Sequence, residues 1–157
     1  TSFGDWEDSF ITYSKYHDCF FASFANQHAI YQIKKTSDEI WTSTLYAGNN
    51  GQGIEEGHRL LDARLNHPHG ITVNNDGEIF VVNKGSCPWC SDGHVILKIF
   101  GDMVELIAGN PNSNNPLVNG DPLESTFKVP RNISIDSDGN YIIAGGEDRT
   151  VRKLSIE

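Results

Sequence analysis

Two cysteines and a tryptophan in the middle of the chain form its most reactive local motif. Cys87 and Cys90 have the CxxC spacing, which redox enzymes use where a helix N-terminus lowers the pKa of the first thiol. The flanking residues indicate strands and no helix, so we expect a local disulfide that pins an exposed loop, with free thiols or thiol exchange as alternatives. Trp89 lies between them, either displayed to a partner or tucked against a sheet edge.

Histidines form the second candidate site. His67 and His69 flank Pro68, and neutral imidazole is a common zinc ligand. The simpler interpretation is two surface histidines beside a turn proline. A calcium loop is suggested by residues 136–140, but the glutamate that such a loop needs downstream is absent. We therefore expect no cofactor, with zinc or calcium as the alternative.

A repeat determines where these residues lie. Residues 69–82 align with residues 131–144 at a constant offset (131 − 69 = 62), and each copy holds an apolar alternating strand, an Asp-Gly turn and a second strand. A more degenerate copy begins at residue 10. The remaining strands are expected at 29–33, 39–46, 94–99, 102–107 and 150–154.

Each repeat is expected to form a four-stranded antiparallel meander with two apolar faces. Neighbouring blades cover both faces in a radial array, so the sequence predicts an all-β chain of β-propeller blades. We expect a single propeller segment over residues 1–157, with three blades at about 6–48, 49–109 and 110–157, the last of which lacks its fourth strand.

The repeats resemble a known family. Residues 120–127, the pair Val129-Pro130 and residues 132–140 together resemble an NHL repeat, and residues 65–77 show the same pattern. The resemblance implies a β-propeller that often serves as a recognition platform, while some NHL-type lyases hold a metal with histidines of the innermost strands. Propellers have about four to eight blades, so three blades do not close a ring. We expect further blades from the same polypeptide, or a second copy that completes a six-bladed ring.

The composition limits the classes of partner that the chain is expected to bind. The formal charge is −9, from 12 basic and 21 acidic residues, and no basic cluster offsets it, so we expect no nucleic-acid partner. The longest apolar runs are strand-sized, so we expect no membrane span. The odd count of three cysteines leaves the compartment open, and we favour an extracellular or lumenal one.

Topology predicts where binding occurs. In such a meander the loop before the first strand and the loop joining the second and third strands emerge at one end of the sheet. Our first hypothesis is a non-enzymatic scaffold that binds a protein, peptide or glycan through this loop-rich end. The alternative is a metal-dependent lyase or hydrolase with its site in the central channel. The predicted binding residues are Trp89, His58, His67, His69 and Asn110.

Overall fold

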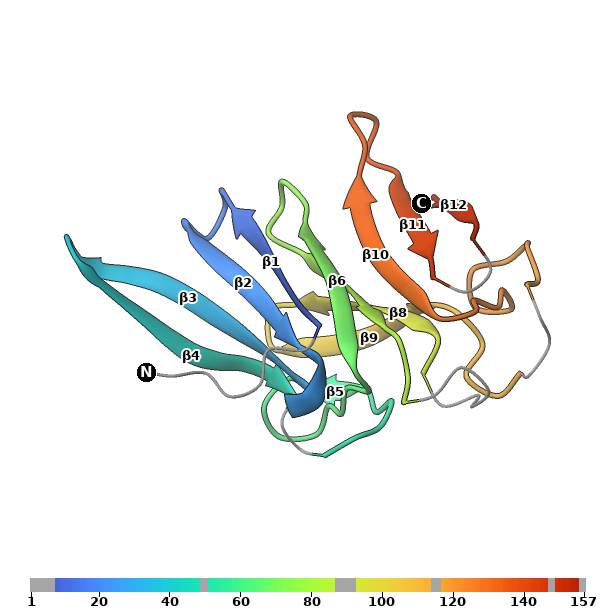
Figure 1. The fold of residues 1–157 in the computed structure, drawn as a ribbon, viewed down its shortest axis with the longest axis horizontal. Coiled ribbons are helices and arrows are strands. Elements are labelled where there is room, and N and C mark those ends of the chain that lie inside the picture. Colours follow the sequence, from blue (N-terminus) through green and yellow to red (C-terminus); the bar gives the residue numbers. More distant parts are fainter. Residues whose placement is uncertain (1–7, 49–50, 87–92, 114–116, 147–148, 156–157) are drawn as a thin grey trace.

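The structure, a computed structural model, describes residues 8–48, 51–86, 93–113, 117–146 and 149–155. Within these ranges the chain is all-β, with one 3-10 helix at Ala25–Gln27 and three antiparallel sheets (Figure 1). The same residues hold no helix of a length and apolarity that would cross a bilayer.

The sheets follow one another along the chain. The first is a meander of β1 (Ser9–Ser14), β2 (Cys19–Phe24), β3 (Ala29–Ser37) and β4 (Ile40–Gly48). The second, in the order β5-β9-β8-β7-β6, contains β5 (Gly57–His58), β6 (Pro68–Val73), β7 (Ile79–Asn83), β8 (Val95–Phe100) and β9 (Met103–Ala108). The third contains β10 (Pro130–Ile135), β11 (Tyr141–Gly145) and β12 (Val151–Leu154).

Every strand expected from the repeat is present, and β5 is an addition. This two-residue strand pairs with β9 and forms the outer edge of the second sheet. It is too short for the alternation of apolar and polar residues that indicates a strand in a sequence. The prediction of an all-β chain of antiparallel meanders is therefore confirmed.

The hairpin turns differ in detail from the expected tight turn at Asp76–Gly77. Only the glycine has a positive φ, 83° at Gly77. The last strand pair is Val73 with Ile79, so the loop spans residues 74–78. The side-chain oxygen of Asn74 accepts two backbone N–H groups and closes this loop. Asp136 does the same in the third sheet, which explains the acidic residue there as a turn former.

The sheets pack face to face around two apolar clusters. Alternate residues of β7 point to opposite faces: Ile79 and Val81 pack against the first sheet, and Phe80 and Val82 against the third. All four are at most 1% exposed. A strand that is buried on both faces reads as a continuous apolar run, as this one does. Cys19 lies in the first cluster and is 2% exposed.

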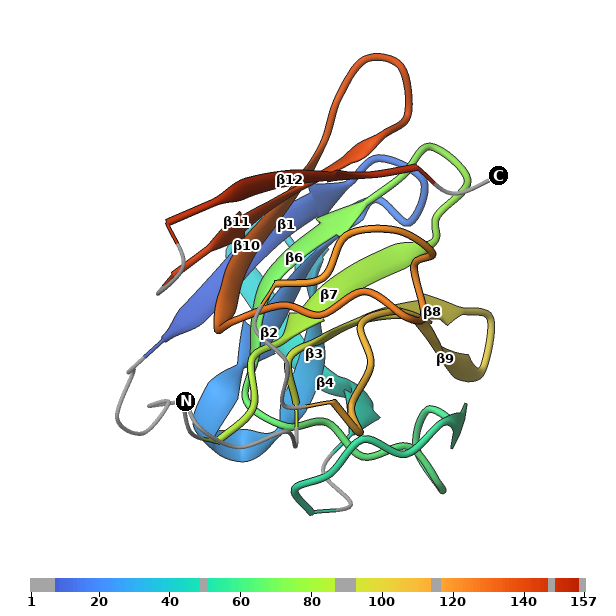
Figure 2. The ribbon, with the colours of Figure 1, turned by 90° about the vertical axis from the view of Figure 1, so that its right-hand side faces the viewer.

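The first strands of the three sheets lie side by side. β6 packs between β1 and β10, and Figure 1 shows these strands as the adjacent edges of their sheets. The hairpins β1–β2, β6–β7 and β10–β11 lie at the top in Figures 1 and 2, and the loop that connects the first sheet to the second lies at the bottom. We call this lower end, with residues 25–28, 51–67, 84–86 and 109–113, the loop end.

Glycine at position 70 permits the close approach of β6 and β10. A Cβ on Gly70 would lie 2.5 Å from Asn132 Cα and 2.8 Å from the Arg131 carbonyl oxygen. Both are backbone atoms, which cannot rotate away as a side chain can. The absence of a side chain at Gly70 therefore sets the spacing of these inner strands.

We expect Gly70→Ala to lower the free energy of unfolding by about 3 kcal/mol, the upper range for overpacking, because β6 and β10 must separate. Equilibrium urea unfolding followed by tryptophan fluorescence measures this. Gly53→Ala is the matched control, since its added Cβ would approach no backbone atom closely and would meet Cβ and Cδ of Arg64 at 3.2 Å. Equal effects of the two changes would contradict the role of Gly70.

Candidate functional site

Backbone hydrogen bonds join the loops at the loop end. Within the second sheet, the N–H of Lys84 donates to the His67 carbonyl (3.1 Å) and the N–H of Gly85 to the Asn66 carbonyl (2.9 Å). In the third sheet, the N–H of Gly146 donates to the Val129 carbonyl (2.8 Å). The loop before the inner strand and the loop after the second strand therefore meet at one end, as predicted.

His67 is held between two polar neighbours. Its backbone N–H donates to His28 Nδ1 (3.2 Å), the two rings meet edge to face at 4.6 Å, and its own Nδ1 lies 2.9 Å from Asn66 Oδ1. Desolvation lowers the pKa of His28, so this imidazole is neutral at pH 7. Because His28 Nδ1 accepts a hydrogen bond, its Nε2 carries the proton and acts as a donor.

Asn66 is a buried polar residue at the loop end. It is 1% exposed, and its backbone N–H donates to Asn83 Oδ1 (2.8 Å). Asn83 is fully buried, and its Nδ2 has no hydrogen-bond partner among the described residues. The interaction fixes Asn66 relative to β7 before any ligand arrives.

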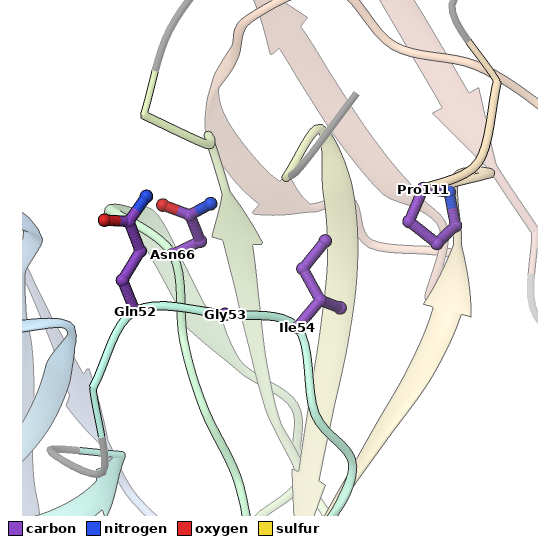
Figure 3. Close-up of a pocket in the computed structure, with 5 residues that line it drawn as sticks. All are labelled: Gln52, Gly53, Ile54, Asn66 and Pro111. Atoms are coloured by element: carbon purple, nitrogen blue, oxygen red, sulfur yellow. The ribbon is translucent and has the colours of Figure 1, made fainter. Parts of the chain in front are cut away.

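An open depression of about 410 Å³ lies beside Asn66. Amide side chains and apolar side chains face it, and none of the lining residues is charged. Gln52 forms a backbone bridge with Leu65, the residue before Asn66, and Figure 3 shows the Gln52 and Asn66 amides pointing the same way. The lining residues are Gln52, Gly53, Ile54, Asn66 and Pro111.

His69 lies at the other side of the loop end, on the inner strand β6. It is fully buried and packs against Phe10, with ring centroids 5.5 Å apart. Its Nε2 is 3.6 Å from Asp8 Oδ2, which is also 3.8 Å from Lys84 Nζ. Burial, with the charge of Lys84, lowers the pKa of His69 to about 4. His69 is therefore neutral at pH 7 and not the surface residue that the sequence suggested.

The structure separates the predicted binding residues. His67 is half-buried at the loop end, and Asn110 lies there too, beside Pro111 of the depression. His58 is on β5, four strands from β6, which corresponds to about 19 Å at 4.8 Å per strand. Cys87, Trp89 and Cys90 lie outside the described residues, so the disulfide and the displayed tryptophan stay predictions.

Sequence reasoning missed Asn66, Asn83, Gln52, Asp8 and Lys84. Asn83 lies seventeen residues from Asn66, and nothing local in the sequence pairs them. The sequence held a signal for Asp8, because it stands directly before the first inner strand as His67 stands directly before β6.

Metal binding was the alternative use of His67 and His69. Among the described residues, no three His, Cys, Asp or Glu side chains lie close enough to hold a metal ion. The Asp136 carboxylate, in the loop that resembles a calcium site, accepts hydrogen bonds from the Asn140 side chain at 3.1 and 2.9 Å. The Asp136 carboxylate is therefore engaged by the turn that it closes.

Comparison with known proteins identifies the repeat. The sequence model of the NHL repeat matches residues 65–87. Those residues therefore carry the sequence pattern of an NHL repeat. The repeat includes β6, β7, Asn66 and His67, so part of the loop end belongs to it. No curated protein matches the chain significantly.

Two solved structures are similar to almost the whole chain. One is a structural genomics protein of unknown function from Bacteroides thetaiotaomicron, with 26% identity, a TM-score of 0.77, and coverage of 92% of this chain and 34% of that chain. The other is an auxiliary nutrient binding protein from Bacteroides ovatus, with 18% identity, a TM-score of 0.76, and coverage of 94% and 37%. The chain thus spans about a third of the length of each, and the second likeness shows the fold alone.

The buried imidazole of His69 makes stability depend on pH. Its pKa in the fold, about 4, lies below the ordinary 6.5, so between these values the unfolded chain binds a proton that the folded chain does not. We expect the free energy of unfolding to fall by up to about 3 kcal/mol as the pH drops from 6.5 to 4. Urea unfolding at several pH values measures this.

His69→Phe should remove most of this pH dependence, because it replaces the imidazole with an apolar ring in the same buried site. His28 and His17, whose pKa values burial also lowers, leave a smaller slope of the same sign. His58→Gln, on the outer edge, is the control and should keep the full slope. An unchanged slope in His69→Phe would contradict the assignment to His69.

Proposed function

We propose that the three sheets are consecutive blades of an NHL-type β-propeller, and that the chain is a non-enzymatic module that binds a protein, peptide or glycan at its loop end. The observation that carries this proposal is the depression beside Asn66, formed by preordered residues at the end where the loops meet. Such loop clusters on a rigid scaffold are common binding sites. The fold likeness to an auxiliary nutrient binding protein supports binding as the role.

The arrangement of the sheets supports the blade assignment. In each sheet a meander runs outward from the inner strand, and in the second sheet the short β5 is added beyond β9 at the outer edge. The inner strands lie next to one another (Figure 1). We propose blade boundaries at about 6–48, 49–109 and 110–157. The middle sheet is then an interior blade, covered on both faces, which explains its unbroken apolar strand β7.

A further blade is proposed to cover the outer face of the first sheet. That face carries the cross-strand row Ile11, Ala22, Tyr31 and Leu45, with Ile11 62% exposed. Trp41 on the same sheet is 53% exposed and packs on Phe20 at 5.8 Å. An apolar face of this kind is typical of an interface. The covering blade comes from the same polypeptide or from a second copy.

Blocking the depression tests the binding proposal. We expect Gln52→Trp to abolish or strongly weaken whatever the chain binds on paired peptide and glycan arrays, because an indole at this exposed position fills the depression. Asn75→Trp is the matched control, since it replaces an exposed amide in the β6–β7 turn at the opposite end. Ligands that bind both variants as well as the unchanged chain would contradict binding at the loop end.

Light scattering, which measures association, tests whether the outer face of the first sheet is an interface. We expect the isolated chain to associate, and Trp41→Glu to shift it toward monomer, because a carboxylate cannot be buried unpaired in an apolar interface. Thr42→Glu adds the same charge at the neighbouring exposed residue on the opposite face and should leave association unchanged. A compact monomer at all concentrations would count against the propeller assignment.

A further inference from the structure

The outer strand β9 of the second sheet has a neighbour on each side. It lies between β8 and the short strand β5, and residues 57–58 of β5 pair with Met103 and Val104. Val104 is fully buried in the first apolar cluster and pairs with Ile99 of β8. The second sheet therefore shows how an outer strand fits between the third strand of the meander and the loop that precedes the inner strand.

The third sheet has the same two neighbours, but no strand of the described residues lies between them. Residues 119–120 are the repeat equivalents of residues 57–58 (119 − 57 = 62). β12 is the equivalent of β8, because each pairs with the second strand of its meander. An open depression of about 260 Å³ is lined by residues 119–120 together with Lys153 and Leu154 of β12. We call this depression, bounded by residues 119–120 and β12, the strand slot.

The floor of the strand slot is apolar. Phe127, Ile143 and Leu154 line it and belong to the second apolar cluster. Their equivalents in the second sheet are fully buried together with Val104, whereas Phe127 and Leu154 each keep 8% exposure. An aliphatic side chain in the position of Val104 would therefore complete the burial of this floor. The equivalents, from the repeat and the strand register, are Leu65, Val81 and Ile99.

β12 forms the edge of its sheet. It pairs with β11 on one side, and no described strand pairs with its other side. An edge strand presents backbone N–H and C=O groups that can pair with a further strand. A segment in the strand slot would therefore hydrogen-bond to β12 as β9 does to β8.

Arg152 connects the two sides of the strand slot. Its guanidinium lies over the Phe127 ring at 4.4 Å, and donates to the carbonyls of Val118 (2.7 Å) and Thr126. These contacts hold the loop before the inner strand against β12. The slot is therefore ordered before a segment enters it, which lowers the entropic cost of binding.

Lys153 indicates the charge of the segment. It occupies the register position of Lys98, since each is the cross-strand partner of the equivalent residue in the second strand. The Lys98 ammonium lies 3.5 Å from the carboxylate of Glu105, which is opposite it on β9. Lys153 is exposed, so a carboxylate at the same position of an incoming strand would pair with it.

A second copy of this chain does not offer such a strand at its described sheet edges. Within their bounds, none of these edge strands contains Asp or Glu. Pairing of two β12 strands would also bring the like charges of Arg152 and Lys153 together. The segment that fits is therefore a different one, with apolar and acidic residues in alternation. The edge strands are β1, β4, β5, β6, β10 and β12.

We infer that the strand slot binds an extended acidic peptide segment of a partner protein, which adds to the third sheet antiparallel to β12. An aliphatic residue of the segment lies opposite Leu154, and a carboxylate lies opposite Lys153. Backbone hydrogen bonds supply affinity, and the alternation of side chains supplies specificity. This surface lies at the outer edge of the third sheet, so the inference does not rest on binding at the loop end.

The experiment uses the full chain and a fluorescent peptide with the sequence of residues 101–109, which contains β9 and has the required alternation. Fluorescence anisotropy measures the Kd, and hydrogen–deuterium exchange locates the peptide. We expect binding, with slower exchange of the backbone amides of residues 151–154.

A charge exchange tests the register. Lys153→Glu should raise the Kd of the peptide by about 3- to 10-fold, because a cross-strand attraction becomes a repulsion. A peptide that carries Glu105→Lys should show the reverse preference and bind the Lys153→Glu variant more tightly than the unchanged chain. Lys15→Glu is the matched control, since it makes the same charge change at an exposed residue of the β1–β2 turn, and should leave both Kd values unchanged.

Four other outcomes would each overturn the inference. Slower exchange at residues 95–100 instead of 151–154 would show that the peptide replaces β9. Equal affinity of both peptides for both charge variants would contradict the pairing with Lys153. Protection of residues 151–154 that grows with protein concentration in the absence of peptide would make a second copy the occupant. Absence of binding at millimolar peptide would remove the strand slot as a docking site and leave the proposal for the loop end unaffected.

Discussion

Both faces of every sheet in this chain carry apolar side chains, and exposing either face to water is unfavourable in free energy. The middle sheet meets this constraint fully: Ile79 and Val81 are covered from one side and Phe80 and Val82 from the other. At about 25 cal/mol per Å² of apolar surface, each such side chain contributes about 1.5–3 kcal/mol. The stacking of the sheets follows from this burial, and the positions of the loops follow from the stacking.

Stacking brings the inner strands together, and it also brings together the polar residues that flank these strands. β6 and β10 approach closely enough that position 70 has no room for a Cβ. The residues directly before the inner strands are therefore forced to the same end of the molecule. Asp8 and Lys84 are distant in sequence but lie close together there, because burial of the apolar faces stacks the sheets that carry them.

The sequence predicted the strands because period-two alternation and Asp-Gly turns are local signals. It did not predict the burial of His69, because the register of β6 against β7 shifts between Pro68 and Ile71. Such a shift changes which side chains face inward. The contact between Asn66 and Asn83 depends on the same register, so it too was outside the reach of local patterns.

The residues before the three inner strands share a backbone conformation but differ in side-chain chemistry. Asp8, His67 and Val129 all adopt left-handed backbone conformations, with φ of 66°, 50° and 50°. This conformation is costly for a β-branched residue such as valine, so the fold itself must impose it at each position. The chemistry, in contrast, differs: a carboxylate, an imidazole and an isopropyl group. The polar character of the loop end therefore belongs to the first two sheets and is not a by-product of the repeat.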